Sequence, residues 1–343
     1  MRKNLKTIML IMTACLPVLL FSGGKKDTEE KGMVISYNSP AQWANWGAVL
    51  EAFTAKTGIA APSDPKNSGQ SMAALEAERK APQADTAYFG IVFGLEAAKK
   101  DLLEPWKPEY FDEIPDNLKA ADGSWYTLHQ GAIAFIVNTA ELKGLPIPKS
   151  WKDLLKPIYK GKVGFLDPTQ AAVGFSVYTA GNLAMGGTLT NWTPGVEYFK
   201  QLYKNGLNLP AQTATAMVQQ GEVPILIDAD FNGYKLKYID NAPVDVVIPE
   251  EGSISIPYVI SLVKGAPNRE NGQALINFSL SDEGQRLFTE SYLRPVRNIK
   301  IAPEIASKIL PASDYKRVSD PDFAKMRAAQ DEATKRWRAE VIR

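Results

Sequence analysis

Three side chains that carry oxygen atoms follow a short apolar run in the C-terminal half of the chain. Residues 221–234 read GEVPILIDADFNGY, and the apolar residues 223–227 predict a buried strand. Asp228, Asp230 and Asn232 then occupy alternate positions where that strand should end. Ligands bind outside the carboxyl ends of strands in open α/β sheets. The three side chains therefore predict contact with a polar molecule, and the alternative is a solvated loop that only ends a strand.

The same segment matches the first half of a calcium-binding EF-hand loop, Asp-x-Asp-x-Asn-Gly. The position that needs a bidentate acid holds Ile239, and the residues before the motif predict a strand rather than a helix. We therefore expect neither a metal site nor a cofactor here.

Polar turns between a predicted strand and a predicted helix recur along the chain. Such turns place free backbone N–H groups and a helix dipole beside a polar ligand. One turn follows the strand at 33–37, one precedes the helical run MAALEAERK, and one follows the strand at 163–166. Their candidate ligand contacts are Asn38, Ser39, Ser68, Gln70, Ser71, Thr169 and Gln170. For Ser68 and Ser71 the alternative is a helix N-cap without a further role.

Aromatic and imidazole side chains at the ends of predicted strands are the remaining candidates. These residues are Tyr88, Phe89, His129 and Tyr258. They could form the walls of a pocket, although aromatic residues at such positions more often belong to the core. The sequence leaves open whether His129, Arg294 and Arg297 reach a ligand.

Strands that alternate with helices predict a largely parallel α/β sheet covered by helices. The polar turns form two sets, and the long apolar strands at 132–137 and 258–263 separate them. We therefore expect two lobes joined by two crossover strands.

Several helices have ends that the sequence predicts. Apolar residues from Trp43 onward have helical spacing, and Gly58 should end that helix. Residues 150–162 should hold an N-capped helix followed by a turn. In the C-terminal tail Asp320 is the expected N-cap, with Pro321 at the first helical position.

The first 24 residues predict a secretory signal peptide. A basic start, MRKNLK, precedes the apolar run TIMLIMTACLPVLLF, and small residues follow at 22–24. The apolar run is short for a membrane span. We therefore expect an extracytoplasmic, periplasmic protein whose residues 25–32, KKDTEEKG, form a flexible tether. Cys15 lies in a rough lipidation box, Met-Thr-Ala-Cys, which leaves a lipid anchor open.

Composition and missing motifs exclude several classes of function. The net charge is +1 over 343 residues and no basic face dominates, so nucleic acid is not an expected partner. The chain has one histidine and one cysteine, and it lacks GxSxG, HExxH, CxxC, Walker and GxGxxG motifs. We therefore expect a binding protein and not an enzyme. A secreted hydrolase that uses carboxylates is the alternative from a different class.

Three longer segments carry a family resemblance: SWKDLLKPIYKGKVGFLDPT, GEVPILIDADFNGY and YVISLVKGAPN. Together they make the chain similar to the extracytoplasmic solute-binding proteins of ABC importers, in the type II group that binds polyamines, iron(III) and 2-aminoethylphosphonate. The resemblance implies a two-lobed periplasmic-binding-protein type II fold with a hinge of two crossover strands. It places lobe 1 at 33–132 and 259–310, and lobe 2 at 133–258 and 311–343 with the C-terminal helices.

The resemblance also implies partners and a mode of action. A small-molecule ligand would bind between the lobes, the lobes would close by a hinge motion, and a monomer would deliver the ligand to a membrane permease. A chemoreceptor partner that binds the same ligand and signals instead is an alternative use of this fold.

The ligand class is predicted from positions at which this chain differs from other members of the group. Iron(III) binders of this group carry two adjacent tyrosines where this chain has Asp230-Phe231-Asn232, which disfavours a ferric site. Polyamine binders usually add an acid on the hinge strand, where this chain has Ile256-Pro257-Tyr258. A zwitterion of the phosphonate or phosphate type would use helix N-termini for its oxyanion and Asp228 or Asp230 for its amine. We therefore expect such a zwitterion, with polyamines next and iron(III) as the further alternative.

Overall fold

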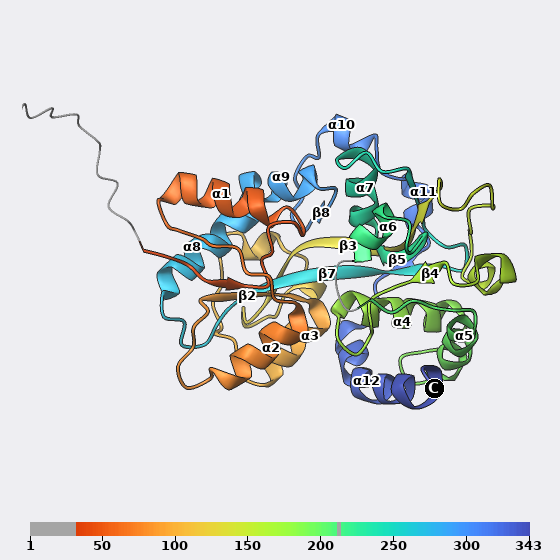
Figure 1. Cartoon of the computed structure of the whole chain (residues 1–343). Helices are drawn as coiled ribbons and strands as arrows, with labels where there is room; N and C mark the ends of the chain where they lie inside the picture. Colours follow the sequence, from red (N-terminus) through yellow and green to blue (C-terminus); the bar gives the residue numbers. More distant parts are fainter. Residues whose placement is uncertain (1–31, 211–213) are drawn as a thin grey trace, which may run out of the picture.

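The computed structural model describes residues 32–210 and 214–343. These residues form two lobes that lie side by side and share one sheet (Figure 1). The predicted signal peptide at 1–24, Cys15 and all of the tether except Gly32 lie outside the described residues. Within the described ranges, no helix is long and apolar enough to cross a membrane.

Two long strands connect the lobes, as the sequence predicts. β3 (Tyr126–Asn138) and β7 (Ser253–Leu262) run antiparallel, with Ala132 opposite Ser255. Both strands are buried along almost their whole length, and strands covered on both faces consist mainly of apolar residues. They extend beyond the apolar runs, since Gln130 pairs with Pro257 and Gly131 with Ile256 in the same ladder. The Ser253 hydroxyl also donates to the Ile133 carbonyl.

Lobe 1 contains β1 (Ser36–Tyr37) and β2 (Thr86–Gly90), which are parallel, and β2 pairs antiparallel with β7. The short strand β8 (Arg294–Pro295) pairs with β3. The helices of this lobe are α1 (Trp46–Thr57), α2 (Ser68–Ala77), α3 (Ile91–Lys99), α8 (Arg269–Leu280) and α9 (Asp282–Glu290). Buried aromatic rings join them, since Phe53 of α1 contacts Phe278 of α8 at 5.7 Å between ring centres.

Lobe 2 contains β4 (Val163–Gly164), which is parallel to β5 (Ile225–Ala229), and β6 (Val244–Val247). β5 and β6 both pair antiparallel with β3. The helices of this lobe are α4 (Ala172–Ala184), α5 (Thr193–Lys204), α6 (Ala214–Gln219), α7 (Asp230–Tyr238) and α12 (Phe323–Arg336). After α12, the fully buried Trp337 contacts the rings of Phe165, Tyr178 and Phe199, which anchors the C-terminus to this lobe.

Short elements complete the described chain. They are η1 (Phe111–Glu113), η2 (Asp116–Leu118), η3 (Lys152–Leu155), η4 (Pro157–Tyr159), α10 (Pro303–Ala306), α11 (Ala312–Tyr315), β9 (Val318–Ser319) and the π turn η5 (Trp337–Val341). The chain returns from β8 in lobe 1 to lobe 2 through α10, α11 and β9, and β9 pairs with β7.

The prediction of a largely parallel sheet is wrong. β3 pairs antiparallel with β5, β6, β7 and β8, and parallel pairing is limited to β1 with β2, β4 with β5 and β7 with β9 among the described strands. The reason is topological, since β3 runs from lobe 1 to lobe 2 and β7 runs back beside it. A strand buried on both faces is apolar in either direction, so the sequence pattern did not report the direction.

The N-cap of α2 differs from the two residues predicted for this role. Asn67 is the N-cap, and not Ser68 or Ser71. Its Oδ1 accepts from Gln70 N at 2.9 Å, and Gln70 Oε1 accepts from Asn67 N at 3.0 Å. This reciprocal pair is a capping box, and it leaves the Ser68 side chain free for other contacts.

Other helix ends are partly as predicted. Gly58 ends α1 with a φ of 76°, a left-handed conformation that favours glycine. The helix expected in 150–162 is instead two 3₁₀ turns, η3 and η4, because Pro157 cannot continue a helix. The tail helix is capped by Asp322, while Asp320 accepts a hydrogen bond from the Ser255 hydroxyl.

Candidate ligand-binding site

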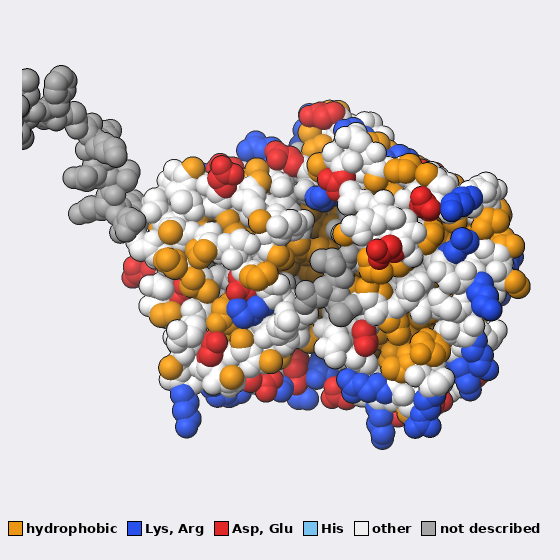
Figure 2. Space-filling view, in the orientation of Figure 1, with side chains coloured by type: hydrophobic (Ala, Val, Ile, Leu, Met, Phe, Trp, Pro, Cys, Tyr) orange, Lys and Arg blue, Asp and Glu red, His pale blue; other side chains and the backbone are white. Residues whose placement is uncertain are grey.

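A cleft of about 260 Å³ lies between the two lobes. Figure 2 shows the hollow where they meet. Lobe 1 contributes the segments that follow β1 and precede α2, and lobe 2 contributes the starts of α4 and α6 and the end of β5. The side chains with polar groups that line it are Asn38, Gln42, Trp43, Lys66, Asn67, Ser68, Thr215, Asp228 and Tyr258.

The lobe 1 wall presents an amide and a hydroxyl that hold each other in place. Asn38 has a left-handed backbone, with a φ of 64°, and its Nδ2 donates to the Tyr88 carbonyl at 2.8 Å. Asn38 Nδ2 also lies 3.4 Å from Ser68 Oγ, which accepts from Gly90 N at 3.2 Å. The start of α2 is thereby fixed to the carboxyl end of β2.

An ammonium group stands at the edge of the same wall. Lys66 Nζ lies 2.7 Å from Asp64 Oδ2 and 3.9 Å from the centre of the Tyr37 ring. The Asp64 carboxylate is itself held by Asn38 N at 3.0 Å. This arrangement positions a cation beside the N-terminus of α2.

The lobe 2 wall presents the N-terminus of α4. Ala171, Ala172 and Val173 line the cleft, and α4 begins without a side-chain cap. The first N–H groups of a helix have no partner within the helix, and together with the helix dipole they favour an anion. The α4 N-terminus is therefore free to bind an oxyanion, and it faces the α2 side of the cleft.

Asp228 is the acidic residue in the described lining of the cleft. Its side chain is buried, and one carboxylate oxygen accepts from Ala229 N at 2.6 Å and from Asn232 Nδ2 at 3.2 Å. No described lysine or arginine forms an ion pair with it. Burial raises the pKa of Asp228 to about 7. A cation supplied by a ligand would favour the charged carboxylate.

Known proteins resemble this chain in sequence. A family model described as bacterial extracellular solute-binding protein matches residues 82–328. The chain belongs to this family. A relative from Salmonella typhimurium, provisionally named as a 2-aminoethylphosphonate-binding periplasmic protein, is 34% identical over 257 residues, which cover 73% of each chain. Spermidine/putrescine-binding periplasmic protein 1 of Haemophilus influenzae is 26% identical and covers 77% of this chain and 74% of its own.

The fold of this solute-binding protein is that of known periplasmic binding proteins. AfuA from Actinobacillus pleuropneumoniae, in a structure with exogenous fructose-6-phosphate bound, superposes with a TM-score of 0.80 at 24% identity. The match covers 91% of this chain and 99% of AfuA. The two-lobed type II fold is therefore confirmed, and the family implies a small-molecule ligand and a permease of an ABC importer as partner. The relatives are binding proteins and not enzymes.

A buried aromatic layer supports the cleft of this solute-binding protein from behind. The Tyr88 ring stacks on the Tyr258 ring at 5.5 Å, and the Tyr88 hydroxyl lies 2.9 Å from His129 Nε2. Burial lowers the pKa of His129 to about 3, so its imidazole is neutral at physiological pH. This histidine holds Tyr88 in place and brings no positive charge to a ligand.

The predicted site residues divide into two groups. Asn38, Ser68, Asp228 and Tyr258 line the cleft. The others lie beside or behind it: Ser39, Gln70, Ser71, Tyr88, Phe89, His129, Thr169, Gln170, Asp230 and Asn232.

The second group has structural partners of its own. The Ser39 hydroxyl donates to the Ser36 carbonyl, Gln70 completes the α2 capping box, and Asn232 donates to Asp228. Thr169 N donates to Asp167 Oδ1 in the turn before α4, and neither Thr169 nor Gln170 lines the cleft. Ser71 and Phe89 are fully buried.

Other lining residues were missed by sequence reasoning. Trp43 fits the apolar spacing of α1, yet the helix begins only at Trp46, and the Trp43 ring lies in the cleft. Gln42, Lys66 and Thr215 belong to no recognisable motif. The sequence signal that could have found Lys66 is its place directly before the polar start of α2.

Asp230 lies at the hinge and holds the lobes together. Its Oδ1 accepts from Ala132 N at 2.7 Å, and its Oδ2 accepts from Arg294 Nη1 at 2.7 Å and from the Tyr315 hydroxyl at 2.6 Å. Arg294 belongs to β8 in lobe 1, whereas Asp230 begins α7 in lobe 2. The structure thus gives this carboxylate structural partners, and Arg294 reaches the hinge.

We expect Arg294→Met to lower the free energy of unfolding by about 2 kcal/mol, because a fully buried carboxylate loses its cationic partner. Urea denaturation monitored by circular dichroism measures the change. Lys264→Met is the matched control, since the Lys264–Asp101 pair is exposed and such pairs contribute less than about 1 kcal/mol. An equal effect of both substitutions would contradict the role assigned to Arg294.

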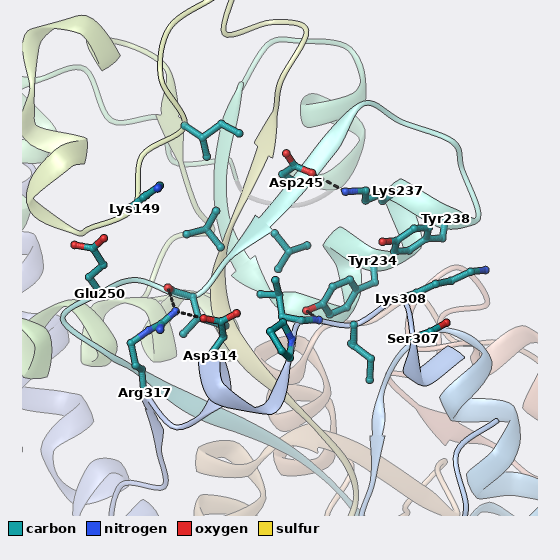
Figure 3. Close-up of a pocket in the computed structure, with 17 residues that line it drawn as sticks. Lys149, Tyr234, Lys237, Tyr238, Asp245, Glu250, Ser307, Lys308, Asp314 and Arg317 are labelled. Carbon is teal, nitrogen blue, oxygen red and sulfur yellow. Dashed lines mark hydrogen bonds and ion pairs between the residues drawn. The ribbon is translucent and has the colours of Figure 1, made fainter. Parts of the chain in front are cut away.

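A larger groove, of about 660 Å³, lies on lobe 2 away from the cleft. Figure 3 shows it between α7, β6 and the segment that contains α10 and α11. Its charged groups largely pair with one another: Lys237 Nζ lies 2.6 Å from Asp245 and Arg317 Nη2 lies 2.8 Å from Asp314. No sequence-predicted site residue lines it. Size alone therefore does not make this groove the ligand site.

Clusters of histidine, cysteine, aspartate and glutamate that could hold a metal ion do not occur within residues 32–210 and 214–343.

Proposed function

We propose that the cleft binds a small zwitterion that carries an ammonium group and a phosphonate or phosphate group, of the 2-aminoethylphosphonate type. The observation that supports this most is Asp228, a buried carboxylate that faces the cleft without a cationic partner. Burying an unpaired charge is costly, and an ammonium group on the ligand would form an ion pair with this carboxylate. The protein would then deliver this solute to its permease.

Other groups of the cleft lining favour a negative charge. The uncapped N-terminus of α4, the N-terminus of α2 and the Lys66 ammonium all adjoin it. Helix N-termini bind phosphate-like groups through backbone N–H groups. The relative named for 2-aminoethylphosphonate binding supports the same ligand class.

Ligands of other relatives fit the lining less well. A polyamine has at least two ammonium groups, whereas Asp228 is the one carboxylate in the described lining. A sugar phosphate, as bound by AfuA, has no amine and leaves Asp228 without a cation. Iron(III) prefers several anionic oxygen donors, and the described lining offers this carboxylate and the Tyr258 hydroxyl.

A thermal-shift comparison tests the proposal. We expect 2-aminoethylphosphonate to stabilise the protein, whereas ethylphosphonate, ethylamine and putrescine at equal concentration stabilise it much less. A ligand at a hundred times its dissociation constant adds about 2.7 kcal/mol of stability, which is readily detected. Stabilisation by putrescine and not by the aminophosphonate would overturn the assignment and leave a polyamine binder.

Ligand affinity should depend on pH through Asp228. Because the pKa of Asp228 is about 7 without ligand, a proton competes with the ammonium below that pH. We expect the affinity to fall by up to about tenfold per pH unit below pH 7, and binding to release a proton. Calorimetry at pH 6 and pH 8 in two buffers of different ionisation enthalpy measures both effects.

The control for this pH dependence is the same titration with Asp228→Asn, which isolates the titration of the phosphonate group itself. Equal pH profiles for the two proteins would show that Asp228 does not meet the ammonium.

A further inference from the structure

The corner of the cleft around Asp228 has aromatic walls. Trp43 and Tyr258 line the cleft beside this carboxylate. The Trp43 ring meets the Tyr258 ring edge-on at 5.8 Å between centres, and Phe231 lies behind both at 5.4 Å and 6.1 Å. Asp228 and Tyr258 line the same cleft, and burial, the Tyr88 hydroxyl and the negative charge of Asp228 together raise the pKa of the Tyr258 hydroxyl. We call Asp228, Trp43 and Tyr258 the ammonium corner.

The ammonium corner offers few hydrogen-bond acceptors. One oxygen of Asp228 already accepts from Ala229 and Asn232, and no described residue donates to the other. The Tyr258 hydroxyl has no hydrogen-bond partner among the described residues. The corner therefore provides one free carboxylate oxygen and one hydroxyl as acceptors.

A primary ammonium group carries three N–H donors. Two of them can reach the acceptors of the ammonium corner, and the third faces aromatic carbon. A methyl group in place of this third hydrogen loses no hydrogen bond and contacts an indole or phenol ring. Aromatic rings attract methylated ammonium groups, whose positive charge is spread over the methyl hydrogens.

The aromatic walls are rigid enough to define such a site. Tyr258 is buried, and its ring stacks on Tyr88 with 12° between the ring planes. Tyr88 is held in turn by His129. The ring positions are thus fixed by a buried layer before any ligand enters.

We propose that the ammonium corner binds a monomethylated ammonium group at least as well as a primary one and also accepts a dimethylated group, so that the ligand class extends to N-methyl and N,N-dimethyl aminophosphonates. This inference rests on the proposed function for its phosphonate end. A trimethylated group keeps its attraction to the rings but loses every N–H donor to the buried carboxylate. Affinity should therefore be retained through the first methyl group, decrease slightly with the second and fall with the third.

Calorimetry with 2-aminoethylphosphonate and its N-methyl, N,N-dimethyl and N,N,N-trimethyl derivatives tests the proposal. We expect the monomethyl compound to bind at least as tightly as the primary amine, the dimethyl compound within about tenfold and the trimethyl compound more weakly than that. A loss of more than about tenfold at the first methyl group would overturn the proposal, because it would show that all three N–H donors are paired.

Two variants distinguish the contributions of the Tyr258 hydroxyl and the Trp43 ring to binding. Tyr258→Phe keeps the ring and removes one acceptor, so it should weaken the primary amine several-fold and leave the dimethyl compound unchanged. Trp43→Leu should weaken the methylated compounds more than the primary one. An equal effect of Tyr258→Phe on every compound would contradict the assigned acceptor even if the Trp43 variant did not fold.

The same methyl series built on putrescine distinguishes failure of this inference from failure of the proposed function. If only the putrescine series binds, the phosphonate assignment fails, and the methyl dependence within that series still decides the inference. If 2-aminoethylphosphonate binds and its methyl derivatives do not, the inference alone fails. If no amine of either series binds, both are wrong.

Discussion

Asp228→Asn should weaken binding of an aminophosphonate by about a hundredfold or more, because losing a charged partner of a buried ammonium costs about 3 kcal/mol. The amide keeps the shape of the side chain and an oxygen that accepts from Ala229 N. It removes the charge that the ligand requires. Calorimetry at pH 8, where the wild-type carboxyl is ionised, measures the loss.

The same substitution should stabilise the protein without ligand at pH 8. Burial raises the pKa of Asp228 to about 7, above the value of about 4 in an unfolded chain. The folded protein therefore binds this proton more tightly than the unfolded chain does. The resulting contribution of protonated Asp228 to the free energy of unfolding is complete below pH 4 and is lost as the pH rises through 7. At pH 8 the buried carboxylate costs on the order of 4 kcal/mol. An asparagine avoids this cost.

Melting curves of the wild type and Asp228→Asn at pH 4 and pH 8 test whether the substitution stabilises the protein at pH 8. The melting temperature of Asp228→Asn should exceed that of the wild type at pH 8, and the difference should largely disappear at pH 4. Asp245→Asn is the control, because Asp245 is partly exposed and paired with Lys237; its effect should stay below about 1 kcal/mol. A destabilised Asp228→Asn at pH 8 would mean that the carboxylate has an internal partner.

Asp228 faces the cleft whereas Asp230 lies at the hinge, and this difference shows how far the sequence could predict the site. Alternate positions in a strand point to one face, so the pattern Asp-x-Asp suggested two carboxylates for one ligand. The strand ends at Ala229 and α7 begins at Asp230. This switch from strand to helix turns Asp230 towards Arg294 at the hinge while Asp228 faces the cleft. The sequence predicts the strand and the polar residues, but not the residue at which the helix begins.

The hinge strands were predictable for a simple physical reason. Residues buried on both faces of a sheet must be apolar, and 132–137 and 258–263 are long apolar runs. The proposed oxyanion site was harder to predict from the sequence. It includes the backbone of Ala171, Ala172 and Val173, whose apolar side chains do not indicate a binding role in the sequence. Backbone N–H groups become a binding site only through the placement of a helix start, which tertiary packing decides.

The two lobes meet at a glycine that no motif identifies. Gly90 ends β2 and is the N-cap of α3 in lobe 1, and a Cβ atom placed on it would lie 2.4 Å from Cβ of Ala172 at the start of α4 in lobe 2. Close by, a Cβ on Gly69 would lie 3.1 Å from the carbonyl oxygen of Gln170. The two lobes thus meet through small residues at the starts of α2, α3 and α4, beside the proposed oxyanion site.

Gly90→Ala should therefore weaken ligand binding by about tenfold or more, because it lowers the population of the fully closed state. The backbone of Gly90, with φ −62° and ψ 142°, suits alanine, so the fold itself should not be strained. The melting temperature without ligand should stay close to that of the wild type. Calorimetry measures the affinity, and small-angle scattering with saturating ligand should show a larger radius of gyration than for the wild type.

The double variant Gly90→Ala/Ala172→Gly provides the decisive control. It moves the methyl group from lobe 2 to lobe 1 and leaves a single Cβ at the contact, so it should restore most of the lost affinity. Ala172 is the first residue of α4, where a glycine costs less than in a helix interior, for which the cost is about 1 kcal/mol. If the double variant binds as weakly as Gly90→Ala alone, the loss comes from α3 and not from the contact between the lobes. Restored binding would show that the starts of α3 and α4 must touch for the cleft to hold its ligand.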